Sequence, residues 1–383
     1  MTSRHQVLFV LPSLGGGGAE RATIDLLRGL DAKRFVKSLA LFSSQGSFSS
    51  QLPGDVRVHD LQGRQQLVLR PAAAGYDVRL VLRLAKVLRH QHPELVVSVL
   101  RHANLITLIA HRLAGSSARL IVNEQNLPSA EFALFGGFRV KGLLLRQLYP
   151  HAHAVTAISQ GIADELVSTF GLAEQKMHVI HNPVDVDRLQ ALGAVELKHP
   201  WFEMGWPVIV AAGRLHPQKG FAHLLRAFVQ VRNEIPCKLV ILGEGPLRTE
   251  LQQLIVELNL ADDAALPGFQ ENPYNYMRSA SVFVLSSLFE GFGNVLAEAL
   301  ALGAPVVSTR CPVGPDEIIS DGETGILVPT GDEGALAQAI LRVLRDENLR
   351  RKLAANGPPR AAHFALPRVV SQYEQLFDRL LGA

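Results

Sequence analysis

The chain has 383 residues, enough for two domains, because a single hydrophobic core stops growing at about 250 to 300 residues. Hydrophobic residues make up 48% of the chain and charged residues 19%, which excludes a disordered, collagen-like or coiled-coil protein. The formal net charge is +3, and no uncharged apolar stretch of about 18 residues predicts a membrane-spanning helix. The first residues lack a signal-peptide pattern, and the two cysteines, Cys237 and Cys311, lack metal-ligand spacing. We therefore expect a globular protein of the reducing cytoplasm.

The charge is divided unevenly along the chain. Residues 1–183 hold 20 Lys and Arg against 12 Asp and Glu, and residues 184–383 hold 18 against 23, so their net charges are +8 and −5. A basic half favours an anionic partner, which is a phosphorylated ligand, a nucleic acid or an acidic membrane surface, although chance surface composition is an alternative. We do not expect a nucleic acid, because no RRM, helix-turn-helix or zinc-finger signature accompanies the charge.

The first half alternates between strand and helix patterns. Residues 6–12 form an apolar run of strand length, four glycines follow at residues 15–18, and residues 19–30 have helical spacing. Further strands are predicted at residues 36–42, 95–100, 119–123 and 154–158, and further helices at residues 78–90 and 160–170. Strands that alternate with helices predict βαβ units and a doubly wound parallel sheet.

The same alternation restarts in the second half, after the motif Asn182-Pro-Val-Asp185 and a less periodic stretch over residues 189–206 that we expect to be a hinge. Strands are predicted at residues 208–212, 238–242, 264–266, 282–285 and 305–308, and helices at residues 221–233, 273–279, 294–302 and 334–345. We therefore expect Rossmann-like domains over residues 1–183 and 184–365. Ligands of such sheets bind outside the carboxyl ends of the strands, which favours a site between the two halves.

Two glutamates lie eight residues apart around a turn between a predicted strand and a predicted helix. Glu290 stands in the segment Glu290-Gly-Phe-Gly293, and Glu298 falls about one turn into the helix that begins near Asn294. Backbone N–H groups at a helix start favour an anion such as phosphate, whereas carboxylates favour sugar hydroxyls or a developing positive charge. Ordinary solvated acids at a helix start are the alternative.

Two cations occupy the corresponding turn after the first strand of the second half. Arg214 and Lys219 lie in the segment Gly213-Arg-Leu-His-Pro-Gln-Lys-Gly220. A guanidinium and an ammonium group there can neutralise the charge that builds on a departing diphosphate. Cations at one strand end and carboxylates at another fit a ligand with both a diphosphate and hydroxyls, which describes a nucleotide sugar.

The glycine run at residues 15–18 opens the first helix, so amides near Gly16 and Gly17 can approach a phosphate without obstruction by a Cβ atom. The run lacks the Gly-Lys-Ser/Thr ending of a Walker A loop. A flexible turn is the alternative interpretation.

Together these motifs resemble the retaining glycosyltransferases of family four, and the resemblance covers nearly the whole chain. Additional matching segments are Leu242-Gly-Glu-Gly-Pro246, residues 311–319 and Gly325-Ile-Leu-Val-Pro329. The resemblance implies the GT-B fold, in which two Rossmann-like domains face each other across a cleft. It further implies that the segment 366–383, whose residues 366–381 have a helical pattern, crosses back to the first domain.

The family's activity is the transfer of a hexose from a nucleoside diphosphate sugar with retention of anomeric configuration. By resemblance, Arg214 and Lys219 bind the donor diphosphate, Glu290 contacts donor-sugar hydroxyls and Glu298 holds the ribose. Backbone amides at Gly293, Asn294 and Val295, and the loop at Gly16 and Gly17, complete the phosphate cradle. The resemblance implies neither a metal ion nor a cofactor besides the donor.

One segment departs from the family pattern. Many members carry a donor-contacting His after the strand that corresponds to residues 119–123, but here the sequence reads Asn123-Glu-Gln-Asn126. Glu124 or Gln125 is a candidate substitute, and His102, after the preceding predicted strand, is another. The sequence leaves this choice open.

Basic residues at helical spacing suggest a membrane contact. Arg79, Arg83, Lys86 and His90 form a stripe beside Val81, Leu82, Ala85 and Leu88, and a second segment combines Phe132, Phe135 and Phe138 with Arg139, Lys141 and Arg146. Such mixtures suit the interface of an anionic membrane, where a lipid-linked acceptor would lie. A solvated helix face and a core helix with exposed cations are the alternatives.

The sequence thus predicts a retaining glycosyltransferase that moves a hexose or N-acetylhexosamine to a lipid-linked glycan or another surface-polysaccharide precursor. We expect a UDP-sugar donor over GDP-mannose, and a location at the inner face of the cell membrane. A sugar-nucleotide epimerase on the same scaffold and a non-catalytic nucleotide-sugar-binding protein are the alternatives. The presence of Arg214, Lys219, Glu290 and Glu298 together argues against a decayed site.

Overall fold

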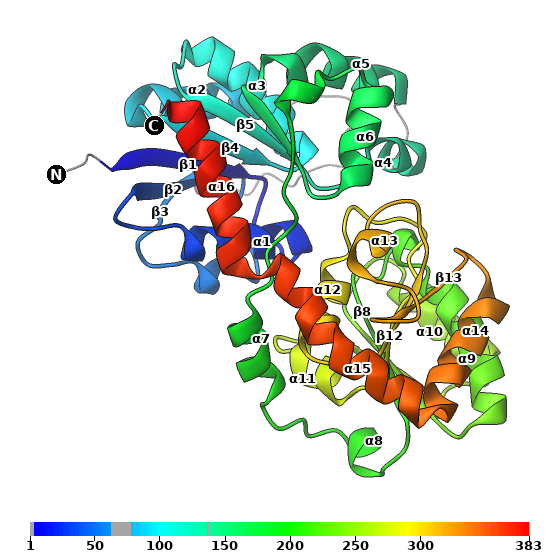
Figure 1. Cartoon of the computed structure of the whole chain (residues 1–383). Helices are drawn as coiled ribbons and strands as arrows, with labels where there is room; N and C mark the ends of the chain where they lie inside the picture. The colour runs from blue at the N-terminus through cyan, green and yellow to red at the C-terminus, as the bar shows by residue number, and fades with distance from the viewer. Residues whose placement is uncertain (1–3, 63–77, 136–137, 383) are drawn as a thin grey trace. The chain divides into compact units, whose positions relative to one another are not determined.

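The computed structural model describes residues 4–62, 78–135 and 138–382. The chain divides into two compact units, the first formed by Met1–Pro183 with Leu366–Ala383 and the second by Val184–Ala365. Each unit contains one parallel sheet with helices packed against it (Figure 1). The predicted α/β class, with two Rossmann-like domains, is confirmed.

Among the described residues of the first unit, the sheet has seven strands in the order β3-β2-β1-β4-β5-β6-β7. All neighbouring pairs are parallel. The strands are β1 (His5–Leu11), β2 (Phe35–Leu41), β3 (Arg57–Asp60), β4 (Leu95–Val99), β5 (Arg119–Glu124), β6 (Ala154–Ala157) and β7 (Met177–Val179). The order reverses beside β1, so right-handed crossovers place helices on both faces of the sheet.

The helices of the first unit are α1 (Gly18–Gly29), α2 (Val78–Gln91), α3 (Arg101–Ala114), α4 (Pro128–Phe135), α5 (Phe138–Leu148), α6 (Gln160–Ser168) and α16 (Leu366–Leu381). The last helix packs against α1, where Val370 lies so close to Gly29 that a Cβ atom on the glycine would be 2.5 Å away from it. Arg34 pairs with Glu374 at 3.0 Å and with Asp378 at 2.5 Å. The C-terminal helix is therefore a structural part of the first unit.

The sheet of the second unit has six parallel strands in the order β10-β9-β8-β11-β12-β13. The strands are β8 (Val208–Ala212), β9 (Lys238–Leu242), β10 (Ala264–Gly268), β11 (Val282–Leu285), β12 (Val306–Thr309) and β13 (Ile326–Val328). The helices are α7 (Val186–Gly193), α8 (Pro200–Glu203), α9 (Phe221–Glu234), α10 (Arg248–Glu257), α11 (Tyr274–Ser279), α12 (Asn294–Ala301), α13 (Pro315–Ile318), α14 (Glu333–Arg345) and α15 (Glu347–Ala361).

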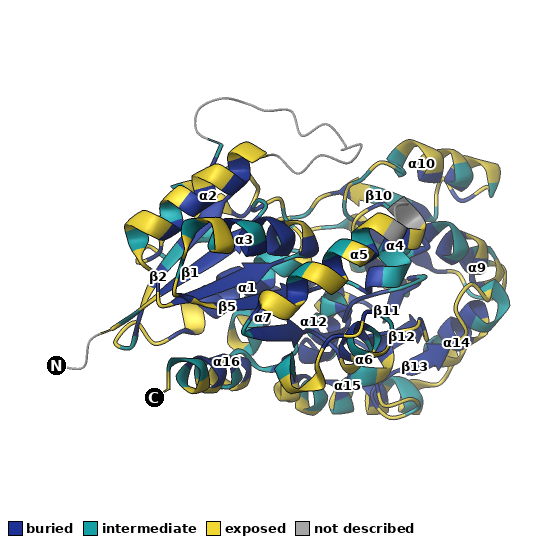
Figure 2. Cartoon of the chain, turned by 90° about the horizontal axis from the view of Figure 1, so that it is seen from above, coloured by how far each residue is buried: buried dark blue, intermediate teal, exposed yellow. Residues whose placement is uncertain are grey.

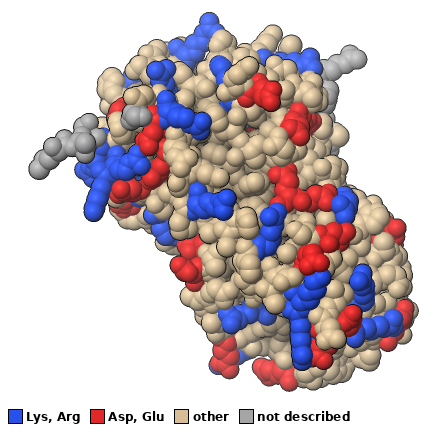
Figure 3. All heavy atoms as spheres, in the orientation of Figure 1, with Lys and Arg blue, Asp and Glu red and all other residues tan. Residues whose placement is uncertain are grey.

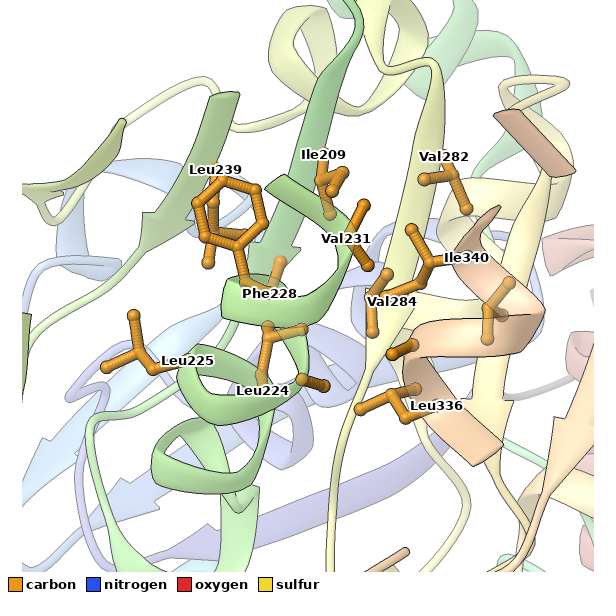
Figure 4. Close-up of a cluster of buried hydrophobic side chains, with 14 of the residues drawn as sticks. Ile209, Leu224, Leu225, Phe228, Val231, Leu239, Val282, Val284, Leu336 and Ile340 are labelled. Carbon is orange, nitrogen blue, oxygen red and sulfur yellow. The ribbon is translucent and has the colours of Figure 1, made fainter. Parts of the chain in front are cut away.

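Apolar residues on both faces of the strands explain why helices cover both sheets. Every residue of β4, β8 and β9 is buried, as expected of parallel strands that lie between two layers of helices. Figure 2 shows the strands mostly buried and the outer faces of the helices exposed. In the second unit, Phe228 and Leu224 of α9 and Ile340 of α14 fill a core against the sheet (Figure 4).

The expected hinge stretch is not an irregular linker. Residues 189–206 include most of α7 and all of α8, and α7 packs against α11 and α12 of the second unit. The division between the units lies earlier, after Pro183. This division falls within the motif Asn182-Pro-Val-Asp185 that precedes the stretch. Residues 189–206 show no clear period in the sequence because α7, in which Leu189 and Gly193 are buried, has too few turns.

Part of the predicted membrane segment belongs to the core. The Phe132 ring is 1% exposed and packs edge-on against Phe170, with the Arg101 guanidinium 4.7 Å from its centre. Phe132 therefore does not lie at a surface, and its interpretation as a membrane-facing aromatic was wrong. The side chains of Phe135, Phe138 and Arg139 lie outside the described residues.

The core of the second unit yields a stability prediction. Phe228→Ala removes a fully buried ring, so we expect the free energy of unfolding to fall by about 3–5 kcal/mol. Urea unfolding followed by circular dichroism measures this loss. The matched control is Phe269→Ala at a ring that is 47% exposed, where we expect a change below about 1 kcal/mol. Equal losses in both variants would contradict the packing described above.

Candidate active site

Two loops meet at the carboxyl edge of the second unit's sheet because the strands that precede them, β8 and β11, are neighbours. The loop after β8 contains a 3-10 turn, Pro217–Lys219, and the loop after β11 runs to the start of α12. The Leu288 amide donates to the Gln218 carbonyl at 2.8 Å, and the Gln218 side chain donates to the Phe289 carbonyl at 3.0 Å. The Ser286 hydroxyl donates to the Lys219 carbonyl at 2.9 Å. These bonds fix the two loops to each other.

An ion pair joins the same loops through side chains. Lys219 Nζ lies 2.6 Å from Glu290 Oε1, and the two side chains are 17% and 7% exposed. The Ser287 hydroxyl donates to the same carboxylate oxygen at 2.6 Å, and the Thr309 hydroxyl donates to the Ser287 carbonyl at 2.6 Å. A buried carboxylate requires such partners because desolvation otherwise opposes its charge.

Glycine permits the close approach of the loops. Gly220 has φ +59°, and a Cβ atom there would lie 2.2 Å from the Ser286 carbonyl oxygen. Any larger residue would separate the loop of Lys219 from the loop of Glu290. The glycine after Lys219 is therefore a geometric requirement of the pair.

Positive charge dominates the loop after β8. Arg214 is exposed, and His216 accepts a hydrogen bond from the Gln218 amide at 3.4 Å. Burial, together with the charges of Arg214 and Lys219, lowers the pKa of His216. On the opposite side of the pair, burial and the charge of Glu290 raise the pKa of Cys311 to about 12, so this thiol stays protonated.

The first turn of α12 lies at the same edge. Gly293 precedes the helix with φ +97°, and Asn294 and Val295 form its first residues. No side chain caps this helix start, so its first amides face outward from the helix end. Glu298, one turn further on, is partly buried. The structure thus gathers the predicted residues of the second unit at one sheet edge.

The glycine loop of the first unit follows β1 and opens α1. Gly16 has φ +97°, and Gly17 is the cap residue, without a side-chain cap. A Cβ atom on Gly17 would lie 2.5 Å from a carboxylate oxygen of Glu20. The start of α1 is therefore built from glycine, as the sequence predicted.

The three candidates for the missing histidine have different surroundings. Glu124 is 1% exposed and accepts from Arg101 Nη2 at 2.9 Å and from the Tyr149 hydroxyl at 2.7 Å. His102, at the start of α3, is exposed, and its ring packs edge-on against Phe42. Glu124 is thus an internal partner of Arg101, whereas His102 lies at the surface.

Gln125 is also held inside the first unit. It exchanges hydrogen bonds with the Asn182 side chain at 2.9 and 3.2 Å, and it donates to the Asn123 side chain at 2.5 Å. Sequence patterns missed the roles of Asn182, Arg101 and Tyr149 in this region, as well as those of Ser287 and Thr309 beside Glu290. Of these partner residues, only Arg101 had a signal in the sequence, because it stands next to the candidate His102.

Within residues 4–62, 78–135 and 138–382, no group of three or more His, Cys, Asp and Glu side chains is arranged to hold a metal ion. Across the same described ranges, no helix combines the length and apolar character needed to span a membrane.

Comparisons with known proteins match both units. The model described as Glycosyltransferase Family 4 matches residues 16–188, and the model described as Glycosyl transferases group 1 matches residues 198–360. A Campylobacter jejuni protein is 34% identical over 92% of this chain and 93% of its own length. It is named N-acetylgalactosamine-N,N'-diacetylbacillosaminyl-diphospho-undecaprenol 4-alpha-N-acetylgalactosaminyltransferase.

Two further similarities extend over almost the whole chain. The lipopolysaccharide core biosynthesis glycosyltransferase LpsE of Rhizobium meliloti is 27% identical over 94% of this chain and 95% of its own length. The crystal structure of Anabaena HepE in complex with UDP superposes with a TM-score of 0.77 at 22% identity, covering 98% of this chain and all of that one. The second likeness concerns the fold, which is that of a GT-B glycosyltransferase. Since both sheets, both family matches and a relative of nearly equal length agree, this chain belongs to the family-four type of GT-B glycosyltransferases.

Proposed function

We propose that this glycosyltransferase moves an N-acetylhexosamine or hexose from a UDP-sugar to a lipid-linked glycan, with retention of the anomeric configuration. The observation that carries the proposal is the Lys219–Glu290 pair, which joins a cationic loop to a carboxylate at one sheet edge. A nucleotide sugar offers the matching groups, namely a diphosphate and several hydroxyls.

Each side chain of the edge has a proposed role that its surroundings support. Exposed Arg214 and partly exposed Lys219 bind the donor diphosphate, and the amides at Gly293, Asn294 and Val295 contribute uncharged donors. Glu290 binds donor-sugar hydroxyls, and Glu298 binds the ribose. Lys219 already contacts Glu290, so one ammonium group links the phosphate side of the donor to its sugar side.

The surroundings of Glu290 favour a reaction without an enzymic nucleophile. Its Oε1 atom accepts hydrogen bonds from Lys219 and Ser287, both at 2.6 Å, and such bonds stabilise the charge of the carboxylate and make it a weaker nucleophile. In the proposed reaction the bond from the anomeric carbon to the diphosphate oxygen breaks as the acceptor oxygen bonds to the same face. The departing phosphate oxygen takes the acceptor proton, and Arg214 and Lys219 stabilise its charge.

Two relatives support the choice of donor and acceptor. The Campylobacter jejuni protein is named for N-acetylgalactosaminyl transfer to a diphospho-undecaprenol glycan, and HepE was crystallised with UDP. We therefore propose UDP-sugars as donors before GDP-mannose, and a lipid-linked or other surface-glycan precursor as acceptor. We also propose that neither a metal ion nor a further cofactor takes part.

We further propose that the first unit contacts an anionic membrane at the cytoplasmic side. Helices α2, α3 and α5 contain no Asp or Glu, and α3 packs against both of the others. On α2, Arg79 and Lys86 are exposed beside Val78 and Leu82, which are 66% and 54% exposed. In Figure 3, Lys and Arg side chains line the edge of this unit where Figure 1 shows α2 and α3.

The remaining apolar residues of the predicted stripe do not belong to this surface. Val81, Ala85 and Leu88 are buried toward the core of the unit. The exposed apolar residues on the neighbouring helices are Leu113 of α3 and Val140 and Leu143 of α5, which are between 47% and 64% exposed. Apolar side chains among cations suit anionic headgroups above an acyl layer.

Arg214→Ala tests the leaving-group role without disturbing the ion pair. We expect kcat to fall about 100-fold or more, because one donor to the transition-state charge is lost, while the melting temperature stays unchanged at this exposed site. The assay offers radiolabelled UDP-sugars and GDP-mannose to a membrane extract and counts label in extracted lipid. The control is Arg351→Ala, at an exposed arginine on α15. Wild-type kcat in the Arg214 variant would remove this residue from the mechanism, and the absence of lipid labelling with every donor would refute the acceptor class.

Glu298→Gln tests the ribose contact. The neutral amide forms weaker hydrogen bonds to hydroxyls than the carboxylate does, so we expect UDP to bind about tenfold more weakly. Isothermal titration calorimetry with UDP measures the affinity independently of the transferred sugar. Glu257→Gln, at an exposed position of α10, is the control. If UDP affinity does not change, the ribose contact belongs to another residue.

The double charge reversal Arg79→Glu with Lys86→Glu tests the membrane surface. Each basic residue near an anionic surface contributes about 1 kcal/mol, so we expect binding to fall about 30-fold or more. Flotation with phosphatidylglycerol-containing vesicles at low salt measures it. The control reverses two exposed cations of the second unit, Lys198 and Arg351. Wild-type protein that stays entirely in the soluble fraction would refute the proposal.

A further inference from the structure

The turn that opens α3 is strained. Leu100 has φ +76° and ψ +138°, a backbone conformation that a leucine rarely adopts and that costs about 1–3 kcal/mol. Its amide donates to the Asn123 carbonyl at 3.2 Å, and its carbonyl accepts from the Asn104 amide at 2.9 Å. A strained backbone conformation persists only where surrounding contacts hold it in place. The contacts of the residues next to Leu100 therefore show what holds this turn.

Arg101 follows Leu100 and is buried. Its guanidinium bonds to Glu124 through Nη2 at 2.9 Å and Nε at 3.3 Å, and Nη2 also donates to the Asn126 carbonyl at 3.3 Å. Its Nη1 lies 3.1 Å from Glu131 of α4. Burial lowers the pKa of Arg101, but the charges of Glu124 and Glu131 outweigh this effect, so the net direction is upward.

The carboxylate of Glu124 has a second fixed partner. The Tyr149 hydroxyl donates to it at 2.7 Å and accepts from the Asn104 side chain at 3.1 Å. Burial raises the pKa of Tyr149 well above its ordinary value, so the hydroxyl keeps its proton. The cluster Arg101–Glu124–Tyr149 thus joins the start of α3, the end of β5 and the segment after α5.

A cluster of this kind is a costly way to stabilise a fold. Removing two charges from water requires several kcal/mol per ion, and apolar residues of similar volume often give equal or higher stability. The Arg101–Glu124 pair is 6% and 1% exposed, so it incurs nearly the full desolvation cost. The pair does fix the start of α3 to the end of β5, and it thereby fixes the orientation of the residues beside Arg101.

His102 is the residue directed outward by this arrangement. Its ring packs edge-on against Phe42, with ring centres 5.7 Å apart. Phe42 follows β2, and its amide bonds to the Leu11 carbonyl at the end of β1, immediately before the segment that leads into the glycine loop. His102 therefore lies at the carboxyl edge of the sheet, the edge from which the Gly16–Gly17 segment also begins. Desolvation by the surrounding protein lowers the pKa of His102, so its imidazole is mostly neutral near pH 7.

We propose that Arg101, Glu124 and Tyr149 are positioning residues that hold the strained Leu100 turn and thereby present His102 to a substrate hydroxyl. This inference rests on the proposed function for its substrate. It assigns His102 the contact that the sequence left open, and it assigns Glu124 an indirect role through His102. The hydroxyl belongs to the donor sugar or to the acceptor glycan, both of which offer the same chemistry.

The central experiment replaces the pair by apolar residues of similar volume, in the variant Arg101→Met with Glu124→Leu. We expect a melting temperature close to that of the wild type and a kcat at least tenfold lower for lipid labelling from UDP-sugars.

His102→Ala should lower kcat to a similar extent. The triple variant, which combines all three substitutions, should have a kcat no lower than that of the slower of the double variant and His102→Ala. This non-additivity follows because all three residues act through one imidazole.

Two readouts separate positioning from general damage. The side-chain ¹H–¹⁵N NMR signal of His102, identified by its loss in His102→Ala, should shift in the double variant, and the UDP affinity should not change. The matched control, Lys37→Met with Asp55→Asn, removes another ion pair of the first unit and should leave the His102 signal and kcat unchanged. If the double variant does not fold, Tyr149→Phe removes a single hydroxyl and should shift the same signal and lower kcat.

A folded double variant with wild-type kcat and an unmoved His102 signal would overturn the inference, and so would His102→Ala at wild-type kcat. Failure of the proposed function looks different. In that case the wild type labels no lipid with any UDP-sugar, while the NMR shift of His102 still reports whether the cluster positions the ring.

Discussion

The structure of the site depends on one ion pair, Lys219–Glu290, because it holds together the loops that follow two neighbouring strands. β8 and β11 lie side by side, so their carboxyl ends place an ammonium group and a carboxylate within 2.6 Å of each other. Gly220 lets the loops approach, the Ser287 hydroxyl donates to the carboxylate, and the Thr309 hydroxyl donates to the Ser287 carbonyl. The remaining proposed donor groups, Arg214 and the start of α12, are attached to these same two loops.

Much of the fold could be predicted from the sequence, because parallel strands buried on both faces leave continuous apolar runs. The predicted strands at residues 208–212 and 238–242 coincide with β8 and β9. Other elements lacked a signal. β7 has only three residues, all partly buried, and α15 carries Pro358 and Pro359 in its last turn, where prolines normally indicate a break. Packing of α15 against α12 overrides that local signal, and no linear pattern reveals such a contact.

The residues of the candidate site were predicted better than their partners. Glycine-bordered turns after strands pointed to Lys219 and Glu290, but their pairing depends on the strand order, which the sequence does not display. The same limit explains the interpretation of Glu124 as a ligand contact. A carboxylate at a strand end looks available until the neighbouring strand is known, and here β4 is followed by Arg101, which occupies it.

Each unit has an ion pair at the carboxyl edge of its sheet, and the two pairs differ in how far they are exposed. In each unit, an acid at the end of a strand or just after it pairs with a cation after the adjacent strand, because parallel strands bring these ends together. The Lys219 side chain is 17% exposed and that of Arg101 is 6%, while Glu290 and Glu124 are 7% and 1% exposed. An ammonium group that still reaches solvent can share its charge between the carboxylate and an incoming phosphate. The Arg101 guanidinium is instead enclosed by the Glu124 and Glu131 carboxylates, a carbonyl and the Phe132 ring, which keep it from solvent. Exposure thus distinguishes a pair suited to direct contact with the proposed donor from a pair that can act only through the backbone it holds, so the proposed role of Arg101 in transfer depends on His102.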